Sequence, residues 1–126
     1  QRLVRKLCQK CAIPQVLTES ELRELSKFTH FSYESLQHQH FKKAQGCKDC
    51  TLGFKGRMGI HEVFIMTDKM RGEILTNHDN DKIRDLAIAN GMKTLLQDGV
   101  EKAAAGMTTL EEIFREAGGE DDYAPI

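Results

Sequence analysis

The sequence of 126 residues lacks several features that would place it at once in a familiar class. No apolar run approaches the roughly 20 residues that a membrane-spanning helix needs, so we expect no membrane insertion. No stretch has the pattern of a secretory signal peptide. The glycine-rich stretch 53–59 lacks the Gly-Lys-Ser/Thr ending of a phosphate loop, and this argues against nucleotide binding of that kind there.

There is also no cysteine outside two Cys-x-x-Cys pairs, Cys8 with Cys11 and Cys47 with Cys50. Two such pairs supply a tetrahedral set of four sulfur ligands, which is typical of structural Zn²⁺. A lysine inside each pair offsets the negative charge of a zinc–tetrathiolate and favours the thiolate form. We predict a structural zinc ion on these four residues and no metal catalysis, because four thiolates leave no position for water. Removing the metal is expected to unfold residues 8–58, while the later helices survive in part.

Two other uses of the cysteines remain open: a pair of disulfides, or a redox-active Cys-x-x-Cys. Both are less favoured than zinc, because the two pairs are alike, no cysteine is left over and no signal peptide is recognisable.

Charge is divided unevenly along the chain. Residues 1–58 carry 11 Lys and Arg against 5 Asp and Glu, whereas residues 59–126 carry 7 against 14. This charge asymmetry has two explanations: the two halves attract each other, or the basic half binds a polyanionic partner. The alternative function is therefore a free-standing zinc module that binds nucleic acid through its basic half, with Lys42, Lys43, Lys48, Lys55 and Arg57 on the phosphates. Against it, no aromatic residues interleave with these lysines, and the acidic half would repel DNA.

Periodicity predicts an α+β fold that is mainly helical. Alternation over residues 1–7 predicts a strand that leads into the first cysteine pair, and the β-branched and aromatic run over residues 60–66 predicts a second, buried strand. The metal would bring Leu7 and Gly53 close and set these short antiparallel strands side by side. We predict a small zinc-bound subdomain over residues 1–66.

Helical signals fill most of the remaining sequence. Thr18 and Glu21 form a capping box ahead of a helix whose apolar face holds Leu22, Leu25 and Phe28. Between the cysteine pairs, we expect four apolar residues to contribute to the core: Phe31, Tyr33, Leu36 and Phe41. The interleaved histidines are assigned to the surface or to contacts with the metal ligands rather than to the metal: His30, His38 and His40.

From Thr67 onward apolar residues recur at helical spacing, in stretches that end near Gly91, Gly106 and Gly118. These stripes include Met70, Ile74 and Leu75 first, and Leu110, Ile113, Phe114 and Ala117 last. Threonines 108 and 109 with glutamates 111 and 112 offer two overlapping capping boxes. We predict core rather than a cofactor site on these stripes, a helical C-terminal subdomain over residues 67–118, and a disordered tail over 119–126.

Several stretches occur in a recognisable order: QRLVRKLC at residues 1–8, GCKDC at 46–50, GFKGRMGIHEV at 53–63, GMKTL at 91–95, DG at 98–99 and GMTTLEE at 106–112. Over residues 1–118 the chain resembles the C-terminal region of type II secretion and type IV pilus extension ATPases. Because it enters an apolar and basic stretch directly at Gln1, we expect it to be a piece of a larger protein.

The resemblance implies a fragment of a hexameric ATPase that is cytoplasmic, lies peripheral to the inner membrane through partner proteins, and drives assembly of a pilus or pseudopilus. No Walker A lysine, Walker B acidic pair or histidine box of the family maps onto this sequence. ATP and Mg²⁺ therefore belong to the full-length parent, and the fragment itself is expected not to be an enzyme. Secretion, pilus-assembly and DNA-uptake systems share these motifs, so the sequence does not distinguish which of the three systems the parent protein belongs to.

The partners that the resemblance implies are the ATPase core of the same chain, neighbouring subunits and an inner-membrane platform protein, with no nucleic acid. Arg57, just after the glycines, is a candidate for contact with a nucleotide phosphate or a neighbouring subunit, and the alternative is a surface ion pair. Arg2 is a second candidate of the same kind.

Overall fold

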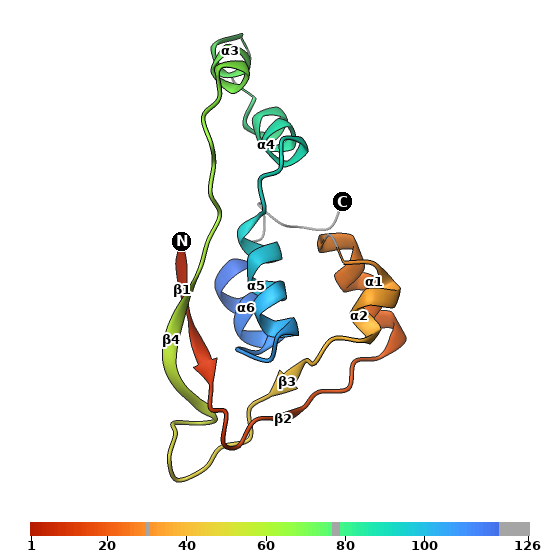
Figure 1. The fold of residues 1–126 in the computed structure, drawn as a ribbon, viewed down its shortest axis with the longest axis vertical. Helices are drawn as coiled ribbons and strands as arrows, with labels where there is room; N and C mark the ends of the chain where they lie inside the picture. The colour runs from red at the N-terminus through yellow and green to blue at the C-terminus, as the bar shows by residue number, and fades with distance from the viewer. Residues whose placement is uncertain (30, 77–78, 119–126) are drawn as a thin grey trace. The chain divides into compact units, whose positions relative to one another are not determined.

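The computed structural model describes residues 1–29, 31–76 and 79–118, and the side chain of Phe28 is outside the described part. The predictions for Phe28, His30 and the tail 119–126 therefore fall outside the described residues. The elements, in chain order, are β1 (Arg2–Leu7), β2 (Ile13–Pro14), α1 (Glu19–Phe28), α2 (Tyr33–Gln37), β3 (Lys42–Lys43), β4 (Phe54–Ile60), α3 (Asp68–Thr76), α4 (Asn80–Ala89), α5 (Leu95–Ala104) and α6 (Leu110–Ala117) (Figure 1). The fold is α+β and mainly helical, as predicted.

The chain divides into two compact units. One contains Gln1–His61 together with the described residues from Leu95 onward, and the other contains Glu62–Thr94. The first unit joins segments from both ends of the sequence, because α6 packs against β1 and α5 packs against α6 and β4. This grouping differs from the ranges 1–66 and 67–118, which stay a prediction about domains. Within the described residues, no helix has both the length and the apolar character to cross a membrane.

Strands β1 and β4 lie side by side as an antiparallel pair, with Arg2 opposite Ile60 and Leu7 opposite Phe54 (Figure 1). The strand predicted at residues 1–7 is confirmed, but the strand predicted at residues 60–66 is wrong. The glycine-rich stretch itself forms β4, and residues 61–67 have no regular structure. The paired region runs from Leu7 and Phe54, beside the cysteine pairs, to Arg2 and Ile60. The apolar residues beyond Ile60 are exposed, including Val63 at 64% and Ile65 at 70%.

The register of this pair shifts between Arg5 and Leu7, where β4 carries one residue more than β1. Gly56 lies in this extra stretch with a φ of +80°, in the left-handed region that suits glycine at a β-bulge. The bulge interrupts the simple alternation of sides along β4. On β1, Val4 and Leu7 are both buried.

A shared hydrophobic core holds the first unit together. Its buried members come from the strands, the helices and the loop before β3: Val4, Leu22, Leu25, Leu36, Phe41, Ile60, Leu95, Leu96, Val100, Ala103, Ala104, Leu110, Ile113 and Ala117. Phe31 and Tyr33 pack against this core, which confirms the core predicted between the cysteine pairs. The exception is Phe114, predicted as core but 39% exposed.

Two predicted helix caps are present in the first unit. The Thr18 side chain accepts a hydrogen bond from the Glu21 N–H at 3.2 Å and begins α1. The Thr109 side chain accepts one from the Glu112 N–H at 3.0 Å and begins α6. Thr108 has a different role, because its hydroxyl donates to the Arg5 carbonyl at 2.7 Å. Of the two overlapping capping boxes, the one at Thr109 therefore caps the helix.

The second unit contains α3 and α4, which pack on each other. Met70 is its buried apolar residue on α3, with 1% of its surface exposed, and the Asn90 amide lies 3.5 Å from the Met70 sulfur. Leu75 was predicted on the same apolar face but is 71% exposed, so that prediction is wrong. The Asp79 side chain caps α4, and Gly91 follows the helix with a φ of +101°, where the sequence predicts this helical stretch to end.

Candidate metal centre

The four cysteines come together although their pairs are 35 residues apart in the sequence. All four Sγ atoms lie within 4.8 Å of one another. Cys8 Sγ is 3.9 Å from Cys47 Sγ, Cys11 Sγ is 3.7 Å from Cys50 Sγ, and the sulfurs of Cys47 and Cys50 are 3.5 Å apart. A tetrahedron with metal–sulfur bonds of about 2.3 Å has edges of about 3.8 Å. The cluster therefore has the size and shape of a site that could hold one metal ion.

Local backbone turns position the sulfurs within each pair. The Ala12 N–H donates to the Cys8 carbonyl at 3.0 Å, and the Cys50 N–H donates to the Cys47 carbonyl at 3.4 Å. The Cys47 N–H also donates to Cys50 Sγ at 3.3 Å. Such N–H donors stabilise negative charge on sulfur. The two turns therefore bring the sulfurs of each pair together, and the Cys47 N–H adds a donor to the cluster.

The two turns are held together by the strand pair beneath them. The Cys8 N–H donates to the Gly53 carbonyl at 2.9 Å, so Leu7 and Gly53 are close, as predicted. Gly53 has a φ of +91°, and a Cβ atom on it would lie 2.5 Å from the Ala44 Cβ. Only glycine suits this combination of backbone angle and crowding. Gly53 therefore allows the backbone to fold closely beside the cysteines.

The thiols differ in how readily they lose a proton. The Lys10 N–H, which hydrogen-bonds the Cys8 sulfur, lowers the pKa of Cys8 to about 7 against the opposing effect of burial. Burial raises the pKa of Cys11. The Asp49 N–H lowers the pKa of Cys47, but hydrogen bonding with Cys50, burial and the other sulfurs together raise it to about 12. Cys8 thus loses its proton more readily than Cys11 or Cys47, and a metal cation would displace protons from these two thiols.

The charged side chains at the cluster are only partly paired. Lys10 Nζ lies 3.3 Å from Asp49 Oδ2, and this ion pair joins the first cysteine pair to the second. Lys48 is exposed, and no acceptor contacts it in the part of the chain that the structure describes. His38 and His40 are also exposed, and neither belongs to the cluster. Among the described residues, the metal-binding group is the four cysteines alone.

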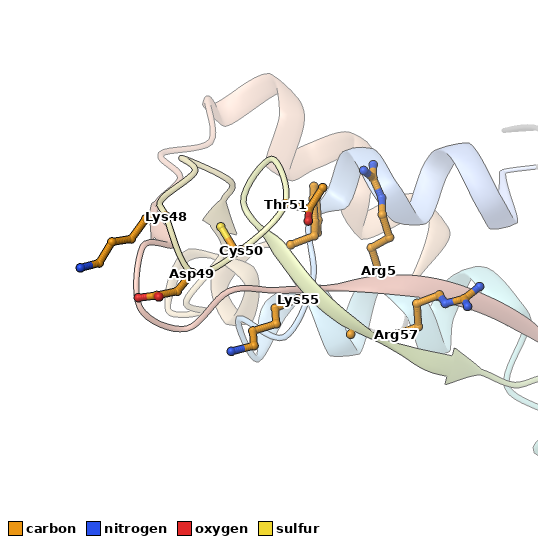
Figure 2. A pocket seen from close by; sticks show the side chains of 9 residues that line it. Arg5, Lys48, Asp49, Cys50, Thr51, Lys55 and Arg57 are labelled. Atoms are coloured by element: carbon orange, nitrogen blue, oxygen red, sulfur yellow. The ribbon is translucent and has the colours of Figure 1, made fainter.

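The two arginines singled out in the sequence lie away from the sulfurs, on the strand pair. Arg2 lies opposite Ile60 at one end, and Arg57 lies opposite Arg5 near the middle. Arg57 lines an open cleft of about 700 Å³ that also includes Cys50, Thr51 and Lys55 (Figure 2). Neither arginine makes an ion pair with a described residue. Their contact with a nucleotide or a neighbouring subunit stays a prediction.

Sequence reasoning did not single out Glu112, which connects the strands to α6. Its carboxylate is 3% exposed and accepts from the Arg5 backbone N–H at 2.8 Å, from Arg5 Nε at 3.1 Å and from Arg5 Nη2 at 2.9 Å. Arg115 Nη2 lies 2.8 Å from the same carboxylate. The sequence indicated Glu112 only as a candidate capping residue. Its contact with Arg5 was not predictable, because the two residues are 107 positions apart.

The α5–α6 turn also contacts the residues beside the cysteines. The Leu7 N–H donates to the Met107 carbonyl at 2.9 Å, and the Gln9 side-chain amide donates to the Gly106 carbonyl at 3.4 Å. No periodicity in the sequence predicts these contacts. They connect the metal-binding turn directly to the C-terminal helices.

A four-sulfur cluster on a strand pair, packed against a helical core, defines a module with a candidate metal site. The model of the type II/IV secretion system protein family matches residues 1–115. The chain belongs to this family, and the homologues identify it as a region of an extension ATPase. The sequence-based recognition of the family is confirmed.

Curated relatives come from both branches of the family. The chain is 38% identical over 115 residues to the type IV pilus assembly ATPase PilB of Thermus thermophilus, covering 90% of this chain and 12% of that protein. It is 36% identical over 118 residues to the type II secretion system protein E of Pectobacterium carotovorum, covering 91% and 22%. It is 33% identical over 116 residues to HxcR of Pseudomonas aeruginosa, covering 91% and 20%. The chain thus spans about an eighth to a fifth of the length of these relatives.

Proposed function

We propose that the four cysteines hold a structural Zn²⁺ ion. The observation that carries this proposal is that all four sulfurs lie within 4.8 Å of one another, with three of the pairs at 3.5 to 3.9 Å. These three distances are close to the edge of a zinc–tetrathiolate and well above the disulfide length of about 2.05 Å. The all-sulfur ligand set also favours zinc over magnesium or calcium, which prefer oxygen. Four thiolates complete the tetrahedron, so the ion has a structural and not a catalytic role.

The zinc would act by closing the long loop between Cys11 and Cys47. That loop contains α1, α2 and the short β2–β3 pair, whose strands are two residues each. Closing such a loop costs chain entropy, to which the short sheet contributes little compensation, so a metal that joins the two ends of the loop would add to the burial of its core residues. A structural zinc site contributes on the order of 10 kcal/mol of apparent binding free energy, which is linked to folding. The metal would therefore fix the start of the β1–β4 pairing.

We further propose that the chain is the non-catalytic C-terminal part of a hexameric traffic ATPase that powers pilus or pseudopilus assembly. Its relatives are named as a type IV pilus assembly ATPase and as type II secretion proteins. In the full-length protein, ATP and Mg²⁺ would bind motifs upstream of this region. The module would lie peripheral to the inner membrane, against its own ATPase core, neighbouring subunits and a membrane platform protein. Its work would be mechanical, as a folded part that presents contact surfaces.

Native mass spectrometry of the purified chain tests the metal assignment. We expect the mass of one zinc ion with all four thiols unmodified, and loss of the ion in Cys47→Ser. His40→Gln is the matched control, since His40 is exposed and outside the sulfur cluster, and it should retain one zinc. A metal-free chain lighter by four hydrogens would instead identify two disulfides, and the zinc proposal would be wrong.

Two assays test the role of the fragment. The zinc-loaded chain should hydrolyse no ATP above the buffer background, and turnover by the chain alone would contradict the non-catalytic assignment. The cleft lined by Lys55 and Arg57 is positively charged, so nucleic-acid binding is the alternative function. It is tested by measuring binding to random DNA at increasing salt concentration. The alternative predicts an affinity that falls steeply with salt, whereas the ATPase-module proposal predicts almost no binding.

A further inference from the structure

The cleft beside the metal centre carries positive charge that the described residues do not neutralise. Its cations are Arg5, Lys48, Lys55 and Arg57, and its one acidic residue is Asp49, which is already paired with Lys10. Arg5 is paired with Glu112. Lys48, Lys55 and Arg57 contact no acceptor among the described residues. Lys48 lies beside the sulfurs and would offset part of the negative charge of a zinc–tetrathiolate, so the cations of β4, Lys55 and Arg57, are the ones available to a ligand.

The strand register places two of these cations against each other. Arg5 and Arg57 lie directly opposite across the β1–β4 pair. The side chains of an opposite pair project from the same face, and like charges at such positions destabilise the pairing. Glu112 and the Phe54 ring, 4.1 Å from the guanidinium, stabilise Arg5 alone. An anion in the cleft would relieve the remaining repulsion at Arg57.

The backbone of β4 offers a second kind of contact. The Arg5 N–H points away from β4, because it donates to Glu112. Arg5 and Arg57 are therefore a non-hydrogen-bonded pair of the ladder, and the Arg57 N–H and carbonyl must also point away from β1. Among the described residues no backbone group pairs with them. β4 thus has a free outer edge at the same position where the cleft has its unpaired guanidinium (Figure 2).

We propose that this cleft binds an extended acidic peptide segment of a partner protein. The segment would add along the outer edge of β4, with its backbone on the free groups of Arg57 and its carboxylates on Arg57 and Lys55. Edge addition supplies main-chain hydrogen bonds, while side-chain charges supply selectivity. The cleft of about 700 Å³ lies in the volume range of ligand clefts.

The geometry favours a peptide over the other polyanions. A bilayer presents a broad surface of headgroups, which has no backbone groups that could pair with a strand edge. Free phosphate contacts one guanidinium well, but it leaves the second cation of β4 without a partner. Because four thiolates around Zn²⁺ would be negative, we assign the strongest carboxylate contact to the Arg57 side of the cleft and not to Lys48.

The test uses the full zinc-loaded chain and a synthetic peptide of alternating Glu and Thr, with a Gln and Thr peptide as its control. Binding is measured by titration calorimetry, and its position by amide chemical shifts. We expect the Glu peptide alone to bind, with the largest shifts over residues 48–59. Because loss of one charge-assisted contact of about 1.4 kcal/mol is a tenfold change, Arg57→Gln should weaken binding about tenfold.

Lys69→Gln is the matched control, because Lys69 is an exposed lysine in α3 with no acceptor among the described residues. It should bind the Glu peptide within twofold of the unmodified chain. Equal affinity in Arg57→Gln and Lys69→Gln would overturn the proposal, as would binding of phosphatidylglycerol vesicles or inorganic phosphate in preference to the peptide. Zinc content is measured for each sample. A zinc-loaded chain that does not bind the peptide contradicts the cleft proposal alone, whereas a metal-free chain contradicts the zinc proposal.

Discussion

Replacing Glu112 tests whether the buried carboxylate, rather than core packing alone, attaches β1 to α6. In Glu112→Gln the side chain keeps its shape and one oxygen acceptor, but it loses its charge and its second carboxylate oxygen. Arg5 and Arg115 are 37% and 58% exposed, so water can solvate part of each guanidinium after the change. We therefore expect the free energy of unfolding to fall by about 1–2 kcal/mol, below the range for breaking a fully buried ion pair.

Glu112→Ala should be more damaging, because it removes every acceptor at this position. The Arg5 backbone N–H then loses its partner together with the guanidinium. We expect a loss of about 2–4 kcal/mol. Urea unfolding of the zinc-loaded chain, followed by far-UV circular dichroism, measures both variants.

The control is Glu111→Gln, an exposed neighbour in the same helical turn, which should change stability by less than about 0.5 kcal/mol. If Glu112→Gln and Glu111→Gln have the same unfolding midpoint, the attachment of β1 to α6 by this carboxylate is refuted.

The same carboxylate predicts a dependence of stability on acid. Burial raises the pKa of Glu112, but the hydrogen bonds and charge of Arg5, helped by the charge of Arg115, outweigh it and lower the pKa below its ordinary value. The stabilisation is therefore complete above the unfolded pKa of about 4.3 and is lost as the pH falls through the lower folded value. Glu112→Gln should remove this part of the acid dependence, so its stability relative to the unmodified chain should improve as the pH falls below about 4.

Two further predictions concern the metal and the helix packing. Chelation of zinc should reduce amide protection over residues 1–61 and also in α5 and α6, because Leu7 and Gln9 bond to the α5–α6 turn, whereas α3 and α4 should change little. Protection in α5 and α6 that survives chelation would contradict this. Gly99→Ala should destabilise the first unit by about 1–3 kcal/mol, because its Cβ would lie 2.6 Å from Ile113 Cγ2. Gly72→Ala in α3 is its control: with no atom within 4 Å, it should stabilise its helix by up to about 1 kcal/mol. Native-state amide exchange measures the two units separately.

Local sequence signals predicted the parts of the structure that depend on near neighbours. The spacing within the two cysteine pairs indicated the cluster, and the spacing from Thr18 to Glu21 indicated the start of α1. The helix cap and the turn within each cysteine pair are contacts over three residues, whereas the meeting of the two pairs is a contact over 39 positions that only a shared metal ligand set predicts. The sequence alone thus identified the residues of the candidate metal centre and the mainly helical fold.

Long-range contacts account for what the sequence could not predict. The run over residues 60–66 has strong strand propensity, yet only Ile60, opposite Arg2, lies in a strand. The glycine-rich stretch has weak strand propensity, yet it pairs because the cysteine turns place it beside β1. The bond between Arg5 and Glu112 spans 107 positions and leaves no periodic pattern. Pairing partners, rather than propensity, decided these elements.

The position of the metal centre at one end of a two-stranded sheet explains why register should depend on it. An isolated two-stranded pair is marginally stable, and a slip of one residue would turn every side chain to the opposite face. A slip in β1 would expose Val4, which is 1% exposed, and would misalign Arg5 with Glu112. An ion bound to Cys8 and Cys47 fixes the distance between the chain segments that lead into the two strands. We therefore expect the zinc to specify one alignment of β1 and β4, with the core of the first unit and the edge of the basic cleft following from that alignment.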